Sequence, residues 1–118
     1  MIIIKERKEH LQEIAMEKLT VSSFLYRLKH TGPTPCMGEY RTRLGLTVSI
    51  SSPAVCKTIN NYFIVNSRKT LEGLTLNFPA NKIKDISRGA GDNGASYFMY
   101  FADGSELTLE LDRELAQV

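Results

Sequence analysis

Residues 97–111 read YFMYFADGSELTLEL, and this stretch predicts a β-hairpin. Asp103-Gly104 separates two runs of apolar residues, and an Asp-Gly pair in that position is the strongest short-range hairpin signal. With a two-residue turn, Phe98 lies opposite Leu109, whereas a three-residue loop exchanges the partners. In both registers one face of the hairpin carries aromatic residues.

The first arm of this hairpin holds five consecutive large apolar residues, 97–101. A core on one side of a sheet cannot bury all of them. Tyr97, Met99 and Phe101 therefore form a face that is either covered within the molecule or exposed as an interaction site. Aromatic and methionine side chains are enriched at such sites, and the occupant would be another protein or a second copy of the chain.

The chain upstream of the hairpin carries further strand patterns. Leu46, Val48 and Ile50 alternate with polar residues, and Asn60-Asn61 separates two short apolar runs. Ile83 and Ile86 stand three apart, which breaks the alternation and predicts a bulge or a short turn before a strand. The predicted strands upstream of the hairpin lie at residues 46–51, 55–59, 62–65, 74–78 and around 82–88.

The N-terminal part of the chain has helical spacing. Residues 4–18 and 21–30 place apolar side chains on one side, with Thr20 as N-cap of the second helix and Gly32-Pro33 closing it. Residues 31–38 hold two prolines and two glycines and predict a linker.

These elements predict an α+β fold in a single domain, residues 1–118. An N-terminal pair of helices packs on a five- to six-stranded, mainly antiparallel meander sheet. The helical part covers about 4–30, the linker about 31–38 and the β part about 44–112.

Composition indicates a folded protein without a membrane span. The chain has 118 residues, 42% hydrophobic and 24% charged, and no apolar run approaches the roughly 20 residues that a span needs. Cys36 and Cys56 have no partner motif, so we expect reduced thiols in a cytoplasmic protein. His10 and His30 are isolated, so we expect no metal and no cofactor.

Charge is distributed unevenly. Residues 46–91 carry six Lys/Arg against two Asp/Glu, and residues 92–118 carry one against six. Basic and acidic strands either pair in one sheet and neutralise each other, or a basic face binds nucleic acid. If residues 82–88 form one strand, the same side of the sheet carries Lys82, Lys84 and Arg88.

Residues 11–29 also have the pattern of a helix-turn-helix motif. The second helix would then place Ser22, Ser23, Tyr26 and Arg27 near bases and Lys29 near phosphate. Two amphipathic helices packed on a sheet as an αα-hairpin explain the same spacing.

The sequence contains no catalytic constellation. Residues 89–94 match G-x-G-x-x-G, but a strand pattern follows where a dinucleotide site needs a helix. We therefore expect a small non-catalytic binding or regulatory module, acting through contacts with another protein or a second copy of itself. The alternative is a nucleic-acid-binding regulator that uses residues 11–29 or the basic sheet face. A small enzyme with its site in the 89–96 loop is the third hypothesis.

Overall fold

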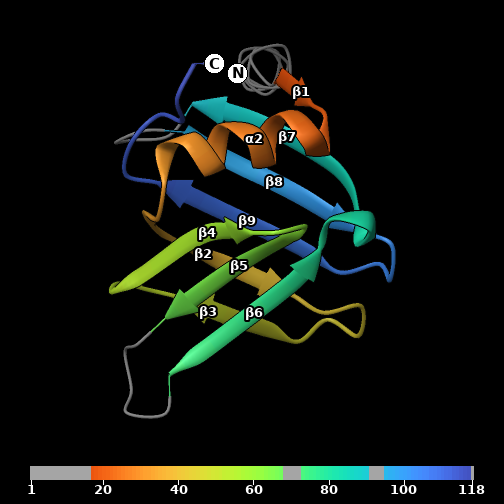
Figure 1. Ribbon diagram of the computed structural model, residues 1–118. Coiled ribbons are helices and arrows are strands. Elements are labelled where there is room, and N and C mark those ends of the chain that lie inside the picture. Colours follow the sequence, from red (N-terminus) through yellow and green to blue (C-terminus); the bar gives the residue numbers. More distant parts are fainter. Residues whose placement is uncertain (1–16, 68–72, 91–94, 118) are drawn as a thin grey trace, which may run out of the picture.

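The described part of the chain is mostly β. The computed structural model describes residues 17–67, 73–90 and 95–117, which form nine strands in one antiparallel sheet, one α-helix and one short 3₁₀ helix (Figure 1). The helices are α2 (Val21–Thr31) and η1 (Ala80–Lys82). The strands are β1 (Glu17–Leu19), β2 (Thr34–Arg41), β3 (Thr47–Ile50), β4 (Ala54–Ile59), β5 (Tyr62–Ser67), β6 (Leu74–Pro79), β7 (Ile83–Ala90), β8 (Ala95–Phe101) and β9 (Glu106–Leu111).

Strand β2 connects two layers of the sheet. The strand order is β1-β7-β8-β9-β2-β4-β5-β6, and β3 also pairs with β2. Along one edge, β2 pairs with β4 at Thr34 and Pro35 and then with β3 from Gly38 onward, while its other edge pairs with β9. Figure 1 shows the β4–β6 layer in front of the β7–β9 layer. Because β2 belongs to both layers, one continuous sheet encloses the core.

Aromatic contacts between the layers form the core. Phe78 of β6 stacks on Phe101 of β8, with ring centroids 4.3 Å apart. Phe24 of the helix contacts Phe63 and Tyr97, at 5.5 and 5.2 Å between centroids. The helix therefore closes one side of the space between the two layers, against β4 and β7.

The helix predicted at 21–30 is confirmed, together with its caps. The Thr20 hydroxyl accepts a hydrogen bond from the Ser23 N–H at 3.1 Å, and Gly32 ends the helix with a φ of 85°. The last turn also holds the C-terminal segment, because the Thr31 hydroxyl accepts from the Ala116 N–H at 2.7 Å. Leu115 is thereby buried in the core.

The predicted pair of helices is wrong, and so is the α+β class built on it. Residues 17–19 form strand β1, in which Leu19 pairs with Ile86 of β7. The sheet edge offers these residues backbone partners that local helical spacing cannot reveal. Residues 4–16 of the predicted first helix lie outside the described residues. The sheet also has more strands than the five or six predicted.

The predicted linker at 31–38 is also wrong, because residues from Thr34 onward belong to strand β2. Pro35 points outward, and its carbonyl accepts from the Asp112 N–H at 3.2 Å. A Cβ on Gly38 would lie 1.8 Å from the Thr108 carbonyl oxygen. Gly38 therefore provides close packing of two strands rather than freedom of a linker.

The hairpin at 97–111 is present, with a three-residue turn instead of the two-residue turn. Phe101 N–H donates to the Ser105 carbonyl at 3.0 Å, and Gly104 adopts a φ of 90°. Met99 therefore pairs with Leu107. A type I turn followed by a left-handed glycine is the usual geometry of such a loop.

The remaining strands follow the predicted alternation. The patterns at 46–51, 55–59, 62–65 and 74–78 correspond to β3, β4, β5 and β6, and Asn60 adopts a φ of 55° in its turn. The register of β7 shifts between Ile83 and Asp85, which confirms the predicted bulge or turn. Gly89 and Ala90 of the predicted 89–94 loop end strand β7, and residues 91–94 lie outside the described residues.

We expect Gly38→Ala to lower the free energy of unfolding by about 3 kcal/mol or more, because the backbone of β9 would have to move. Chemical denaturation measures this loss. Ser49→Ala, on the exposed side of β3, is the control and should change stability by less than about 0.5 kcal/mol. Equal stabilities of the two variants would contradict the close approach.

We expect Leu115→Ala to cost about 2–5 kcal/mol, because the side chain is fully buried beside the helix. Thermal and chemical unfolding measure the loss. Gln117→Ala, two residues further on and exposed, should leave the unfolding midpoint unchanged. A neutral Leu115→Ala would show that the C-terminal segment is not part of the core.

Candidate functional site

Three connections meet at one end of the molecule, which we call the hairpin end: the β2–β3 loop (residues 42–46), η1, and the β8–β9 turn (residues 102–105) (Figure 1). The β2–β3 loop is held by the Thr42 N–H, which donates to the Leu46 carbonyl at 2.8 Å. The Ala102 N–H donates to the Lys82 carbonyl at 2.8 Å and joins the turn to η1. The backbone at this end is therefore fixed by hydrogen bonds.

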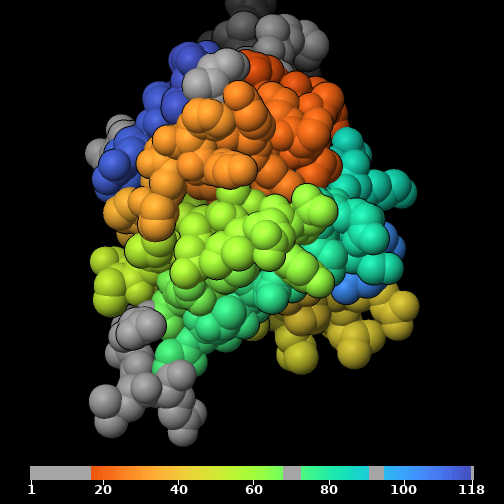
Figure 2. Space-filling view, in the orientation of Figure 1, coloured from red at the N-terminus to blue at the C-terminus, as the bar shows by residue number. Residues whose placement is uncertain are grey.

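Leu44 and Leu46 project from the β2–β3 loop, with 82% and 68% of their surface exposed. They are the most exposed large apolar side chains of the described residues. The left-handed φ of 91° at Gly45 turns the chain between them. Figure 2 shows the β2–β3 loop, in yellow, projecting beyond the body of the molecule.

A pocket of about 500 Å³ opens beside the loop. Tyr40, Phe78 and Phe101 form its aromatic wall, with centroids 5.4 Å apart for Tyr40–Phe78. Lys82 and Asp103 contribute the charged groups of the lining. The site thus combines an apolar interior with charges at its opening, an arrangement that small-molecule and side-chain pockets share.

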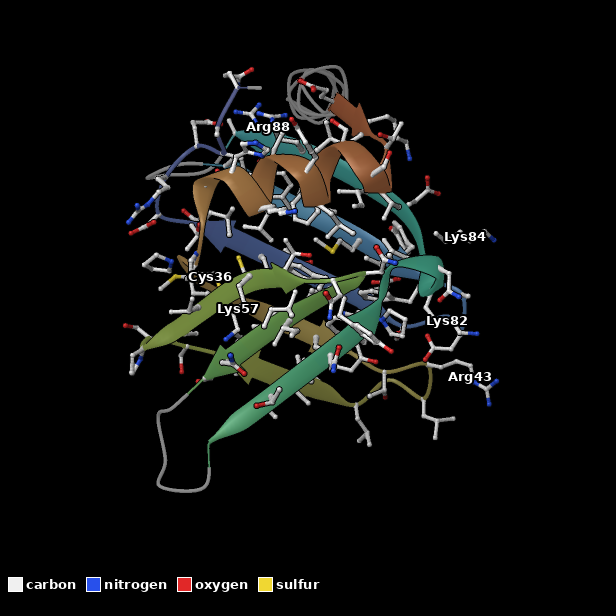
Figure 3. The ribbon with its side chains drawn as sticks, in the orientation of Figure 1. Cys36, Arg43, Lys57, Lys82, Lys84 and Arg88 are labelled. Carbon is white, nitrogen blue, oxygen red and sulfur yellow. The ribbon has the colours of Figure 1, made fainter. Side chains whose placement is uncertain are left out.

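Three cationic side chains lie at this end of the molecule, and Lys82 is the one that lines the pocket. Figure 3 shows Arg43, Lys82 and Lys84 at the same end of the molecule. The Arg43 side chain packs along the β8–β9 turn, since its Cγ lies 3.2 Å from where a Cβ on Gly104 would stand. Within the described ranges, none of these three cations has a carboxylate at ion-pair distance. Their charge is therefore available to a ligand.

Asp103 is the carboxylate of this opening, and Ser105 holds it. The Ser105 N–H and hydroxyl donate to Asp103 Oδ1 at 2.9 and 2.6 Å. These hydrogen bonds, with a smaller contribution from Arg43, lower the pKa of Asp103 below its usual value. The Asp103 carboxylate therefore stabilises the β8–β9 turn.

The predicted interaction residues Tyr97, Met99 and Phe101 are buried. They share the inner face of the sheet with Leu107 and Leu109, so they are covered within the molecule. The outer face of the same hairpin carries Phe98 and Tyr100, residues that the two-residue turn had placed inside. The shift of one residue in the turn exchanges the two faces.

The predicted basic residues do not form one surface. Lys82 and Lys84 lie at the hairpin end, whereas Arg88 lies beside the helix and the C-terminal segment (Figure 3). Arg88 is hydrogen-bonded and ion-paired to Glu114, and that interaction raises its pKa. Lys57 lies on β4, away from both groups.

The helix-turn-helix interpretation does not describe the arrangement around α2. The residues directly before the helix form strand β1, and the Arg27 Nε donates to the Ala116 carbonyl at 3.1 Å. Arg27 therefore secures the C-terminal segment. The other predicted contact residues of this helix, Ser22, Ser23, Tyr26 and Lys29, are exposed.

The sequence interpretation includes Arg43 in the candidate basic face but misses Leu44 and the exposed position of Leu46. Leu46 fits the alternation of the following strand, so it was counted as an inner residue of that strand. Gly45 between two leucines was the available signal, because a glycine there favours a turn with a positive φ.

No cluster of three or more His, Cys, Asp or Glu side chains in residues 17–67, 73–90 and 95–117 is placed to hold a metal ion. In the same ranges, no helix is both long and apolar enough to cross a membrane. No model of a known protein family matches the chain, and no curated protein or solved structure shows significant similarity to it. The function must therefore be argued from the site.

We expect Ser105→Ala to raise the pKa of Asp103 toward its ordinary value, because the hydroxyl donor is lost. In the parent protein the lowered pKa stabilises the fold above pH of about 4, and this stabilisation is lost as the pH falls through the folded-state pKa. Carboxyl-carbon NMR titration measures the Asp103 pKa in both proteins. An Asp103 that titrates normally in the parent would contradict the hydrogen bonds.

Proposed function

We propose that the protein is a non-catalytic binding module that docks an acidic segment of a partner protein at the hairpin end. The observation that carries the proposal is the pair of exposed leucines, Leu44 and Leu46, on a loop whose backbone is fixed. Apolar side chains held outward at a loop tip have no role in the core. Such surfaces are typical of interaction sites.

The size of the apolar contribution indicates what else the site needs. Complete burial of two leucines recovers about 3–6 kcal/mol. That alone corresponds to roughly millimolar to tens-of-micromolar dissociation constants, before the costs of association are subtracted. The leucines therefore need support from the neighbouring pocket and charges to give a specific complex.

Arg43, Lys82 and Lys84 favour an acidic partner. Lys82 lines the pocket and the other two lie at the same end, and none of the three has an ion-pair partner among the described residues. Complementary charge speeds encounter and suppresses wrong partners more than it adds affinity. An acidic segment with an apolar or aromatic anchor fits this arrangement, because the anchor can enter the pocket beside Tyr40.

Single-stranded nucleic acid is the second candidate, because aromatic rings beside cations are the elements that bind it. Phe78 and Phe101, however, are only 8% and 4% exposed, so Tyr40 is the ring that a base could reach. A single reachable ring cannot stack successive bases, and this favours the protein partner.

The test compares acidic peptides with an oligothymidylate as probes. We expect fluorescent acidic peptides that carry one leucine, phenylalanine or tryptophan anchor to bind the parent protein. The double variant Leu44→Ser/Leu46→Ser and the single variant Lys82→Glu should each weaken binding tenfold or more. Melting temperatures should stay within a few degrees of the parent, because all three side chains are exposed. Fluorescence anisotropy measures the affinity.

Lys57→Glu makes the same charge change away from the hairpin end and should leave peptide affinity unchanged. Equal losses in Lys57→Glu and Lys82→Glu would reduce the effect to net charge and refute the site. Stronger binding of an oligothymidylate probe, with affinity falling steeply as salt rises, would favour the nucleic-acid candidate. Light scattering that shows a dimer lost in the leucine double variant would identify a second copy as the occupant.

A further inference from the structure

Two cysteines meet beside a second pocket, at the end of β2 away from the hairpin end (Figure 3). This pocket has a volume of about 420 Å³, and Cys36 lines it. Cys36 is 6% exposed, whereas Cys56 has no exposed surface. Cys36 is therefore the thiol that a small reagent can reach, and Cys56 lies behind it.

The two thiols are neighbours on adjacent strands. Thr34 of β2 pairs with Cys56 of β4, so Cys36, two residues further along β2, is its diagonal neighbour on the inner face. The two side chains are close enough for each to be the largest influence on the pKa of the other. Both cysteines are free.

The interaction between the two thiols makes them unequal. The neighbouring Cys56 lowers the pKa of Cys36, against the opposing effects of burial and of the Asp112 carboxylate. The neighbouring Cys36 and complete burial raise the pKa of Cys56. The thiolate is the nucleophilic form of cysteine, so chemistry begins at Cys36.

The pocket selects the reagent by its charge and polarity. Its walls are largely apolar, from side chains such as Pro53, Val55 and Leu111. Asp112 and Glu110 supply the carboxylates of the lining. Asp112 is ion-paired to Arg113 at 3.2 Å, so the apolar walls are the main selection, and they admit small neutral reagents.

We propose that Cys36 is an oxidative modification site for small neutral hydroperoxides, and that Cys56 is the resolving thiol of a reversible intramolecular disulfide. The Cys36 thiolate attacks the distal peroxide oxygen, the O–O bond breaks, and the leaving alkoxide or hydroxide takes a proton to give alcohol or water. Cys36 is now a sulfenic acid. The Cys56 thiol then attacks this sulfur, the S–OH bond breaks, and water leaves as the disulfide forms.

The strand geometry makes this disulfide reversible. Diagonal neighbours on adjacent strands stand about 7–8 Å apart at Cα, slightly beyond the range of an unstrained disulfide. Pairing between β2 and β4 ends at Thr34 and Pro35, so no ladder hydrogen bond to β4 fixes Cys36, whereas its other edge pairs with Leu111 of β9. Closing the gap to Cys56 therefore strains the β2–β9 pairing, and this strain keeps the disulfide easy to reduce.

The test treats the purified, fully reduced protein with hydrogen peroxide or tert-butyl hydroperoxide. We expect both thiols to disappear together, with the mass falling by two hydrogens and without a covalent dimer. Dithiothreitol should restore both. Cys56→Ser should stop at the sulfenic acid, which dimedone traps on Cys36, and Cys36→Ser should give no adduct. Asp112→Asn should speed oxidation several-fold, because the Asp112 carboxylate raises the pKa of Cys36 and its loss favours the thiolate, while the shape of the side chain is kept.

Circular dichroism checks that the serine variants fold. If one variant does not fold, the parent protein is alkylated instead with a limiting amount of N-ethylmaleimide. Peptide mapping should then find Cys36 labelled before Cys56. The proposal is overturned if thiols are lost only when the protein unfolds, if Cys56 reacts first, or if Cys36 reaches sulfinic acid without a disulfide. The proposal for Cys36 and Cys56 is independent of the partner proposed for the hairpin end.

Discussion

The close approach of β2 to β9 at Gly38 is the constraint on which the two-layer structure depends. A Cβ there would fall 1.8 Å from the Thr108 carbonyl oxygen, so only glycine fits. Gly38 is the first residue of β2 that pairs with β3, opposite Ile50, and it follows the last pairing with β4, at Pro35. The strand thus changes layers where it has no side chain, and the aromatic contact between Phe78 and Phe101 follows from the resulting fold.

The same constraint explains how much of the fold the sequence could predict. Alternation of apolar residues predicts most of the strands, and the Thr20 cap predicts the start of the helix, because these signals are local. The role of β2 is not local. Pro35 and Gly38 are typical of loops, and their place in a central strand depends on Asp112 and Thr108, more than 60 residues away in the chain.

The candidate site could be predicted only in part. Lys82 and Lys84 were identified as cations on one side, and the structure places them at the same end of the molecule. Arg88 differs because Glu114 neutralises it, a contact between distant segments that composition does not reveal. The aromatic face was assigned from an assumed two-residue turn, and a single added residue in that turn moved Tyr97 from a candidate surface into the core.

The strand pairs and ion pairs of the structure explain part of the uneven charge distribution. The acidic strand β9 lies beside β2, where Arg41 stands opposite Glu106. Arg88 of the basic segment forms an ion pair with Glu114 of the acidic segment, so contacts between distant segments balance part of the asymmetry. Among the described residues, Arg27, Lys29, Arg41 and Lys57 have no carboxylate at ion-pair distance, and neither have Arg43, Lys82 and Lys84. The last three lie at the same end of the molecule as the exposed leucines. Folding does not require charge and exposed apolar surface at one end, and the proposed docking of an acidic partner segment is consistent with both.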